Sequence, residues 1–480
     1  MVACNDCIMS VVRLALASLL ISVVVGAEPD PNYQRLSREI FQQLIEINTT
    51  DSVGSTTLAA EAMAKRLRDA GFGAKEVVVL GPNARKGNMV ARLRGTGERK
   101  PILFMGHLDV VEARREDWTF DPFQFLEKDG YFYGRGTQDM KGGDAVLVTT
   151  FIRLKKEGYQ PDRDLILMLT ADEEGGQANG ADWLVKNHRD LVDAEFAINH
   201  DGGGVYTIKG KPLLISVDAT EKLYGDYQLT ATNPGGHSSL PVPDNAIYHI
   251  ADALARLEHY QFPLELNEIT RAYFEKIAGV APPGVAADMR EALKPAPSAE
   301  AVARLSADPI SNSTLHTTCV ATRLEAGHAN NALPQMARAN VNCRILPGHS
   351  KEETRQELIR VFADSSIQVR YVADNGEASD TAPDRAPAKP EPMRADVLKP
   401  LEKIADRMWP SAPVVPTMAT GASDAIYTNP AGIPTYAVSG IAVDLDDIRA
   451  HGKDERVRVR SFYDGVAMYY LYVKALSGGE

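Results

Sequence analysis

Five short apolar runs, separated by segments with helical periodicity, constrain the fold of this chain more than any other feature. The runs are EVVVL (76–80), NMVARL (88–93), PILFMGH (101–107), DLILMLT (164–170) and FAINH (196–200). Several are apolar at nearly every position, which is typical of strands buried on both faces of a sheet. Strands that alternate with helices predict an α/β domain with a mixed central sheet under covering helices. The buried face of the first helix is expected to comprise Leu36, Ile40, Phe41, Leu44 and Ile45.

A second pattern begins near Thr220 and differs from the first. It consists of the strand YQLTATN, the helix DNAIYHIADALARL, a hairpin made of TLHTTCVATRLEA and MARANVNCRIL, the helix ETRQELIRVFA and the strand IQVRYVA. This order of elements predicts a split βαβ, or ferredoxin-like, α+β module. Short helices and Pro-rich breaks near residues 262–312 predict a helical insertion before the hairpin.

The α/β pattern returns after the segment NGEASDTAPDRAPAKPEP. This segment is rich in Pro, Ala and charge, which is typical of a linker or a surface crossing. The helical RADVLKPLEKIADRMW and the motifs TGASDA and RAHGKDERV follow it. We therefore expect residues 28–219 and 393–480 to form one catalytic α/β domain, with residues 220–392 inserted into it.

Residues 1–27 have the pattern of a secretory signal peptide. Arg13 precedes an apolar stretch that ends in Val25, Gly26 and Ala27, small residues that suit signal peptidase. The stretch is short for a membrane span, which needs about 20 apolar residues. The sequence therefore predicts a mature protein from about Glu28 in the periplasm or outside the cell, without a stable membrane span. An uncleaved anchor is the alternative.

Cysteine content and net charge exclude several classes of protein. Only Cys319 and Cys343 remain after cleavage, so a Cys-ligated metal site and a disulfide scaffold are excluded. The two cysteines would face each other across the hairpin, which allows a disulfide, and two buried free thiols are the alternative. The net charge of -12 and the lack of a basic stripe argue against nucleic acid as a partner. A small substrate is expected.

Polar residues that suit a metal site follow the predicted strands. They are His107 and Asp109 in GHLDVV, Asp139 in GRGTQDMKGG, Glu173 and Glu174 in LTADEEGG, Asp201 in NHDGGG with His200 as a rival, and His451 in RAHGKDERV. Each alone fits an ordinary polar strand end, helix cap or solvated acidic turn. In an open α/β sheet, however, ligands bind beyond the carboxyl ends of strands, so the side chains are expected to converge.

In this order the motifs resemble the co-catalytic zinc metallopeptidase family that includes aminoacylase, acetylornithine deacetylase, succinyl-diaminopimelate desuccinylase, glutamate carboxypeptidase and carboxypeptidase S. The resemblance runs from about Tyr33 to the C-terminus. It implies two divalent metal ions, with zinc expected and cobalt or manganese as alternatives. It implies five ligands, with Asp139 bridging both metals: His107, Asp139, Glu174, Asp201 and His451. Many relatives carry Glu where this chain has Asp201.

The resemblance also assigns roles around the metals. Glu173 matches the general base, and Asp109 matches the residue that orients His107. In the inserted unit, which resembles the family's lid and dimerisation domain, His237 in PGGHSSLP matches a histidine that stabilises the oxyanion. In dimeric members that histidine comes from the partner subunit, so a homodimer through this unit is expected as an option. The residues that resemble substrate-binding positions are Arg344, Asn331, Gly421 and Ser423.

These features together predict a two-metal hydrolase that cleaves the amide bond of small peptides or N-acyl amino acids. The planar guanidinium of Arg344 suits a free substrate carboxylate, as in a carboxypeptidase, dipeptidase or aminoacylase. A strand salt bridge is the alternative interpretation of Arg344. Two other functions stay open at this point: a non-hydrolytic binder of small peptides or amino-acid conjugates, and a two-metal aminopeptidase.

Overall fold

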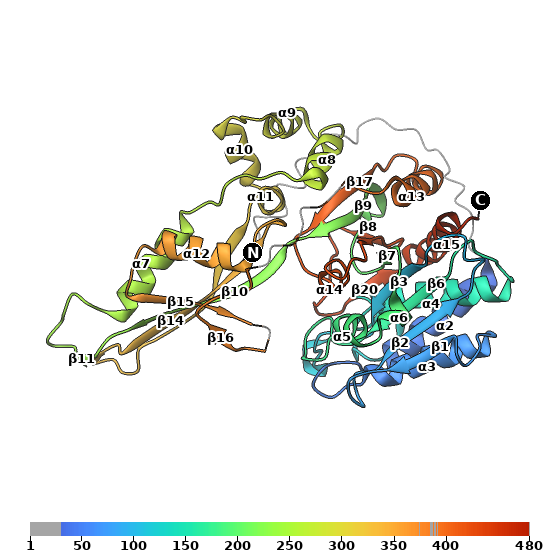
Figure 1. Cartoon of the computed structure of the whole chain (residues 1–480), viewed down its shortest axis with the longest axis horizontal. Coiled ribbons are helices and arrows are strands. Elements are labelled where there is room, and N and C mark those ends of the chain that lie inside the picture. The colour runs from blue at the N-terminus through green and yellow to red at the C-terminus, as the bar shows by residue number, and fades with distance from the viewer. Residues whose placement is uncertain (1–29, 374, 385–386, 388–389, 391, 480) are drawn as a thin grey trace. The chain divides into compact units, whose positions relative to one another are not determined.

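The structure is a computed structural model that describes residues 30–373, 375–384, 387, 390 and 392–479. The chain divides into two units (Figure 1). The first unit contains the chain up to Ala219, Pro392–Thr417 and the chain from Ser423 onward, and the inserted unit contains Thr220–Glu391 and Met418–Ala422. The expected signal peptide, residues 1–27, lies outside the described residues. No helix in the described ranges has the length and apolar character that a membrane crossing requires.

The first unit is built on a mixed sheet that has ten strands among the described residues. In order across the sheet these are β1 (Val77–Leu80), β2 (Asn88–Leu93), β6 (Leu165–Thr170), β3 (Ile102–His107), β7 (Phe196–Asn199), β18 (Thr435–Ala437), β9 (Lys211–Glu221), β8 (Gly204–Ile208) and β19 (Ala442–Asp444), with β17 (Val414–Ala419) also paired to β9. Strands β6, β3, β7 and β18 run parallel, so their carboxyl ends meet at one edge. The five predicted strands and the α/β fold class are confirmed.

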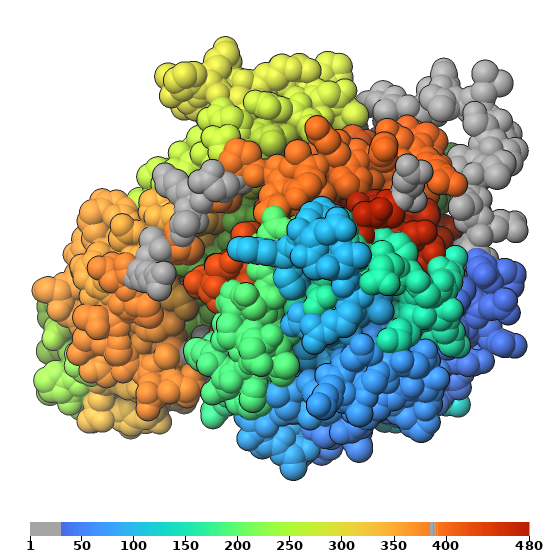
Figure 2. All heavy atoms as spheres, turned by 45° about the vertical axis from the view of Figure 1, so that its right-hand side comes forward, coloured from blue at the N-terminus to red at the C-terminus, as the bar shows by residue number. Residues whose placement is uncertain are grey.

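Helices cover both faces of this sheet. They are α2 (Pro31–Glu46), α3 (Thr56–Asp69), α4 (Lys141–Lys156), α5 (Gly180–Asn187), α6 (Arg189–Val192), α13 (Ala395–Met408), α14 (Ala425–Thr428) and α15 (Val459–Leu476). A smaller sheet joins β4 (Leu126–Lys128), β5 (Tyr131–Tyr133) and β20 (Arg456–Arg458), and a 3-10 turn spans Arg115–Asp117. Figure 2 shows the orange and red C-terminal part of the first unit lying against its blue and teal N-terminal part. The first unit is therefore assembled from both ends of the chain.

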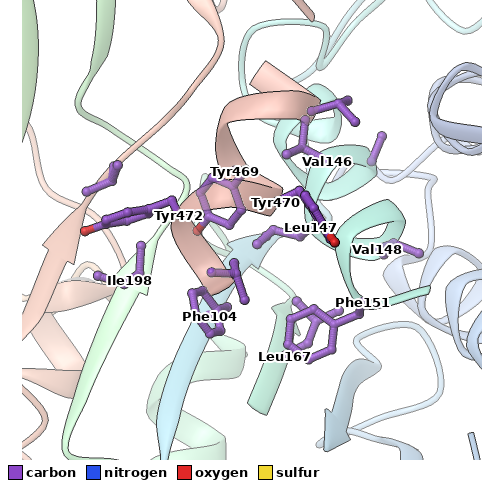
Figure 3. Packing of buried hydrophobic residues seen from close by; sticks show 14 of the residues in the cluster. Phe104, Val146, Leu147, Val148, Phe151, Leu167, Ile198, Tyr469, Tyr470 and Tyr472 are labelled. Atoms are coloured by element: carbon purple, nitrogen blue, oxygen red, sulfur yellow. The ribbon is translucent and has the colours of Figure 1, made fainter. Parts of the chain in front are cut away.

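The core explains why the predicted strands are apolar at nearly every position. Along β3, Phe104 packs between α4 and α15, with its ring 6.0 Å from the ring of Phe151 and 6.2 Å from that of Tyr469 (Figure 3). Its neighbours Leu103 and Met105 belong to a second buried cluster with residues of α5 and α6. Because side chains alternate along a strand, a strand covered on both faces must be apolar at successive positions.

The inserted unit has an antiparallel sheet of five described strands. Its order is β12 (Thr318–Ala326), β14 (Met336–Ile345), β10 (Leu223–Thr232), β15 (Ile367–Val372) and β16 (Ala378–Ser379). Helices α7 (Ala246–Glu258) and α12 (Lys351–Phe362) pack on it, and β11 (Gly236–His237) pairs with β13 (Ala332–Leu333). The predicted order of strand, helix, hairpin, helix and strand is confirmed. The short exposed strand β16 lies within the segment expected to be a linker.

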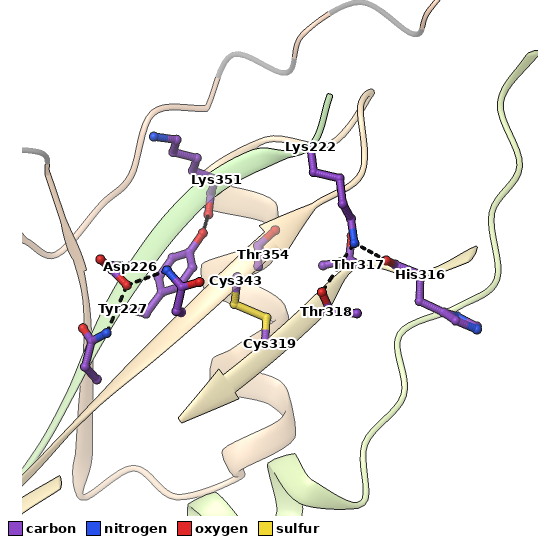
Figure 4. The surroundings of a disulfide bond; sticks show 12 residues. Lys222, Asp226, Tyr227, His316, Thr317, Thr318, Cys319, Cys343, Lys351 and Thr354 are labelled. Atoms are coloured by element: carbon purple, nitrogen blue, oxygen red, sulfur yellow. Dashed lines mark hydrogen bonds between the residues drawn. A yellow bond between two sulfur atoms is a disulfide. The ribbon is translucent and has the colours of Figure 1, made fainter. Parts of the chain in front are cut away.

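The insertion before the hairpin is helical, as expected. It contains α8 (Glu268–Ile277), α9 (Pro283–Ala292), α10 (Ala299–Ser306) and α11 (Pro309–Leu315), which share a small apolar core of their own. The buried Lys222 ties this insertion to the sheet, because its ammonium donates to the carbonyls of Ser313 and His316 at 2.7 Å each (Figure 4).

Cys319 and Cys343 form a disulfide between β12 and β14 (Figure 4). The two residues are direct partners in the antiparallel register, with their Cα atoms 4.1 Å apart. Of the two alternatives that the sequence left open, the structure therefore has the disulfide. It fixes the edge strand of the inserted unit to its neighbour.

Thiol titration checks this bond. A chain that begins at Glu28 is expected to show no free thiol when denatured without reductant, and two after reduction. The bond joins residues separated by 24 positions. Cross-linking at such a separation restricts the unfolded chain, so replacing both cysteines by Ser is expected to lower the free energy of unfolding by roughly 3 kcal/mol in a urea titration. Two free thiols without reductant would contradict the structure.

Candidate metal centre

Three neighbouring parallel strands bring the predicted metal ligands to one edge of the sheet. His107 is the last residue of β3, Glu174 follows β6, and Asp201 follows β7. Asp139 comes from the glycine-rich loop that leads into α4, and His451 comes from the loop between β19 and β20. Residues that are up to about 340 positions apart in the sequence thus converge on one site, because the carboxyl ends of parallel strands face the same way.

Asp139 lies between the two histidines. Its Oδ1 atom is 3.0 Å from Nε2 of His107, and its Oδ2 atom is 3.0 Å from Nε2 of His451. The same Nε2 atom of His451 is 2.8 Å from Oε1 of Glu174. A carboxylate that directs one oxygen toward each imidazole has the geometry expected of a bridging ligand.

The structure places Asp201, and not His200, beside the other predicted ligands. Oδ2 of Asp201 is 4.0 Å from Nε2 of His107. His200 is buried in the core, with its ring 4.8 Å from the ring of Tyr469 and packed against the backbone of Gly143. The two adjacent side chains therefore lie in different surroundings, Asp201 near His107 and His200 in the core against Tyr469.

Asp109 organises the turn that carries the two glutamates. Its carboxylate accepts hydrogen bonds from the backbone N–H groups of Glu173 at 3.1 Å and Glu174 at 2.9 Å. Its main-chain carbonyl is 3.1 Å from Nδ1 of His107, whereas its carboxylate is 3.6 Å away. The carbonyl of Asp109 makes the closer contact with His107, and the orienting role of the Asp109 side chain stays a prediction. A hydrogen-bond partner at Nδ1 fixes the orientation of a histidine whose Nε2 faces a metal.

The electrostatics of the cluster favour bound cations. Burial, with the nearby Asp201, Asp424 and Glu174 carboxylates, raises the pKa of Glu173 to about 10 against the opposing effect of His107. Burial also raises the pKa of Asp201 to about 7. Oxygen and nitrogen atoms of His107, Asp139 and Glu174, and likewise of His107, Glu173 and Asp201, lie within 4.8 Å of one another. Crowded, buried carboxylates next to imidazoles are a donor set that suits zinc and related divalent ions.

Hydrogen bonding acts in the opposite direction at the centre of the cluster. Burial alone would raise the pKa of Asp139, but hydrogen bonds with His107 and His451 outweigh it and hold this pKa below its ordinary value. Hydrogen bonds to Asp139 and Glu174 raise the pKa of His451 to about 10. Asp139 therefore stays ionised more readily than Glu173 or Asp201, which suits its central position.

Asp424 is a residue of the site that the sequence reasoning missed. Its buried carboxylate accepts hydrogen bonds from Oγ1 of Thr170 at 2.6 Å and Nδ2 of Asn179 at 2.7 Å. Burial raises its pKa, and its charge contributes to the raised pKa values of Glu173 and Asp201. The only signal in the sequence was an acidic residue among small ones in TGASDA.

His237 and Asn331 lie together in the inserted unit. His237 is in β11, and the N–H of the next residue, Ser238, donates to the carbonyl of Asn331 at 3.1 Å. Both residues are exposed, and Oγ of Ser239 lies 2.8 Å from Nδ1 of His237. The two-stranded sheet thus presents the histidine and the asparagine side by side.

The other three predicted substrate residues belong to other segments of the chain. Arg344 is half-buried in β14, stacks over the ring of Tyr224 at 4.8 Å, and forms no ion pair with any described residue. Gly421 is exposed in the inserted unit. Ser423 belongs to the first unit, where its Oγ accepts from the N–H of Ala425 at 3.2 Å. The strand salt bridge considered for Arg344 is therefore not formed within the described residues.

A mixed α/β sheet whose strand ends and adjoining loops bring two histidines and four carboxylates together is the framework of a metal-dependent hydrolase. Residues 103–475 match the family model for Peptidase family M20/M25/M40, so the chain belongs to this family. It is therefore a metal-dependent peptidase or amidohydrolase, as the sequence analysis predicted.

Two similar proteins narrow the comparison. A probable carboxypeptidase S-like protein of Dictyostelium discoideum is 28% identical over 407 residues, which cover 81% of this chain and 74% of that one. The human N-fatty-acyl-amino acid synthase/hydrolase PM20D1 is 27% identical over 384 residues, which cover 78% of this chain and 74% of that one.

Solved structures support the fold. The M20 family metallo-carboxypeptidase Sso-CP2 from Sulfolobus solfataricus superposes with a TM-score of 0.68 at 18% identity, covering 92% of this chain and 99% of that one. The YXEP protein of Bacillus subtilis, described as a dinuclear metal binding peptidase, superposes with a TM-score of 0.56 at 11% identity, covering 92% and 99%.

Metal content tests the choice between Asp201 and His200. Asp201→Asn is expected to weaken the binding of one metal ion by more than the 10- to 100-fold that follows loss of an outer hydrogen-bond partner. His200→Gln disturbs the core and is expected to lower the unfolding temperature while both metals stay bound. Elemental analysis after dialysis against a chelator checks both variants. Loss of metal from His200→Gln alone would contradict the assignment.

Proposed function

We propose that this protein hydrolyses the amide bond of small peptides or N-acyl amino acids that carry a free carboxylate, with two zinc ions as its metals. The observation that carries the proposal is the position of Asp139 between His107 and His451, with Glu173 beside them. The similarity to a carboxypeptidase S-like protein and to an N-acyl amino acid hydrolase supports the substrate class.

The ligand set divides into two groups around Asp139. On one side, Nε2 of His451 is 3.0 Å from Oδ2 of Asp139 and 2.8 Å from Oε1 of Glu174. On the other side, Nε2 of His107 is 3.0 Å from Oδ1 of Asp139 and 4.0 Å from Oδ2 of Asp201. When bound there, two divalent ions would supply Lewis acidity that lowers the pKa of water and polarises a carbonyl. Cobalt and manganese accept the same donor atoms and remain alternatives to zinc.

Glu173 is the group that moves the proton, because divalent cations bound beside it would favour its ionised carboxylate against the raised pKa that it has without them. Its carboxylate is largely buried and lies 3.9 Å from Nε2 of His107, so it is next to the ligands. As general base it takes a proton from water, and as general acid it returns this proton to the leaving amine. Asp109 holds the backbone of the Glu173 turn and thereby keeps the carboxylate in place. His237 is proposed to stabilise the oxyanion of the tetrahedral intermediate.

Replacing Glu173 by Ala tests this role. The variant is expected to bind both metals as the wild type does, because the other ligands remain. Its turnover number should fall by 10²- to 10⁴-fold, the usual contribution of a general base. Elemental analysis and steady-state kinetics on one preparation provide both measurements. Wild-type turnover, or loss of metal from the variant, would exclude Glu173 as the base.

Substrate preference tests the proposed reaction. The wild type is incubated with a panel of dipeptides and N-acyl amino acids, each as the free acid and as the C-terminal amide. We expect free acids to be cleaved with kcat/KM at least tenfold higher, since a bidentate contact with the Arg344 guanidinium stabilises a carboxylate. Arg344→Met should remove this preference mainly through KM. Cleavage of substrates with a free amine irrespective of the carboxylate would indicate an aminopeptidase, and binding without products a non-hydrolytic binder.

We propose further that the protein acts in the periplasm or outside the cell. The Cys319–Cys343 disulfide supports this, because such bonds persist in oxidising compartments and are rare in the cytosol. N-terminal sequencing of protein recovered from these fractions should find a new terminus near Glu28. A chain that retains Met1 there would contradict cleavage.

A homodimer through the inserted unit is also proposed. The long edge strand β12 supports it, since seven of its nine residues are exposed and an unpaired edge readily accepts another strand. Sedimentation equilibrium of the metal-loaded protein decides the matter, and a monomer at all concentrations would exclude the dimer.

A further inference from the structure

Glu455 lies four residues after His451 and has no part in the chemistry described above. We propose that Glu455, paired with Arg135, is a positioning residue that joins the loop of Asp139 to the loop of His451. The pair thereby fixes the distance between the proposed bridging ligand Asp139 and the proposed ligand His451. The inference rests on the proposed metal centre, but it does not depend on which substrate is cleaved.

The carboxylate of Glu455 is bonded to the Asp139 loop through both of its oxygens. Oε1 accepts from the backbone N–H groups of Gln138 at 2.7 Å and Asp139 at 3.1 Å. Oε2 accepts from the backbone N–H of Gly136 at 3.1 Å and from Nη1 of Arg135 at 2.7 Å. One side chain from the far end of the chain thus satisfies three backbone donors directly before and at the bridging ligand.

Arg135 completes the connection to His451. Its guanidinium lies 5.0 Å from the ring centre of Trp118, and its Nη2 donates to the main-chain carbonyl of His451 at 3.3 Å. The ion pair is buried, with side-chain exposures of 3% for Arg135 and 0% for Glu455. Breaking this ion pair would leave the buried Arg135 guanidinium and the backbone N–H groups without their acceptor. The energetic cost of that loss holds Glu455 in place.

The position of the pair explains the geometry of the site. Oδ2 of Asp139 is 3.0 Å from Nε2 of His451, although the two residues belong to separate loops more than 300 positions apart. Glu455 bonds the backbone of Asp139, and Arg135 bonds the backbone of His451. Both ligands are therefore located relative to one rigid, buried ion pair. Ligand placement to within about half an ångström decides metal affinity, which is why such partners matter.

A second contact between the loops should let the fold survive loss of Glu455. The amide of Gln138 donates to the carbonyls of Asp447 at 3.2 Å and Arg456 at 2.8 Å. Its Oε1 accepts from the N–H groups of Arg449 at 2.8 Å and Ala450 at 2.9 Å. These bonds join the loops without touching the backbone of Asp139 or His451. Because the Gln138 bonds keep the two loops attached, loss of Glu455 is expected to change the positions of the ligands and not the attachment of the loops.

The test compares Glu455→Gln with a matched control, Asp447→Asn. Asp447 lies in the same loop and accepts from Arg449 at 2.7 Å and Arg456 at 2.8 Å, but its carboxylate bonds neither metal ligand. Zinc affinity is measured by competition with a chromophoric chelator, and the unfolding temperature of the metal-free protein is measured alongside. We expect Glu455→Gln to bind one of the two zinc ions 10- to 100-fold more weakly, and Asp447→Asn to stay within about threefold of the wild type.

Kinetics on fully zinc-loaded protein supply a further readout. Glu455→Gln is expected to lower kcat with little change in KM, because the substrate contacts are untouched. Wild-type affinity for both zinc ions in Glu455→Gln would overturn the proposal. An equal loss of zinc affinity in Asp447→Asn would do the same, since the effect would then be general to the loop.

A second variant covers the case in which Glu455→Gln does not fold. Arg135→Lys keeps a cation beside Glu455 and leaves its three backbone bonds, but it removes the fork that reaches the carbonyl of His451. Arg135→Lys is expected to lower the affinity for one of the two zinc ions by about tenfold, at the lower end of the range expected for Glu455→Gln. Unchanged affinity would overturn the proposal. If the wild type binds two zinc ions and the variants behave as expected, yet no peptide or N-acyl amino acid is cleaved, then only the proposed function fails.

Discussion

The concentration of negative charge at the ends of β6, β3 and β7 is the constraint on which the rest of this structure depends. The carboxylates of Asp139, Glu173, Glu174 and Asp201 lie close together there, and the imidazoles of His107 and His451 oppose part of their charge. Such an arrangement is stable only when the groups are held against their mutual repulsion and when cations are available to them. The surrounding hydrogen bonds hold the groups in place against their repulsion, and the nitrogen and oxygen donor atoms suit the cations.

The apolar runs allowed the framework of the first unit to be predicted from sequence alone. Each run is buried on both faces, so its composition reports directly on its environment, and the polar residue after it marks the strand end. Strands β8, β9, β17, β18 and β19 were not predicted. They are short or partly exposed. Strands β8 and β9 form a local hairpin, but the pairs β18–β7, β18–β9 and β19–β8 each join segments more than 200 residues apart, which local patterns cannot show.

The site was predictable where ligands belong to motifs and was not where residues act through tertiary contacts. His107, Asp139 and His451 were each visible as part of a motif. Asp424 and Glu455 also lie in quoted motifs, TGASDA and RAHGKDERV, but their roles could not be predicted, because these depend on bonds to Thr170 and to the Asp139 loop, which lie far away in the sequence. The choice between Asp201 and His200 illustrates the same limit, because only the tertiary structure shows that His200 packs against Tyr469 in the core and that Asp201 lies near His107.

The division of the first unit across both ends of the chain has a consequence for how the protein matures. Asp139 can contact both His107 and His451 only after the loop of His451 has been synthesised, about 310 residues later. The main segment of the inserted unit, Thr220–Glu391, is complete in the chain before that point and can fold while the first unit is still missing its last strands and α15. The metal centre is therefore a feature of the finished chain. A truncated product that ends before the loop of His451 would carry four of the five proposed ligands and lack the fifth, so the complete ligand set belongs only to the finished chain.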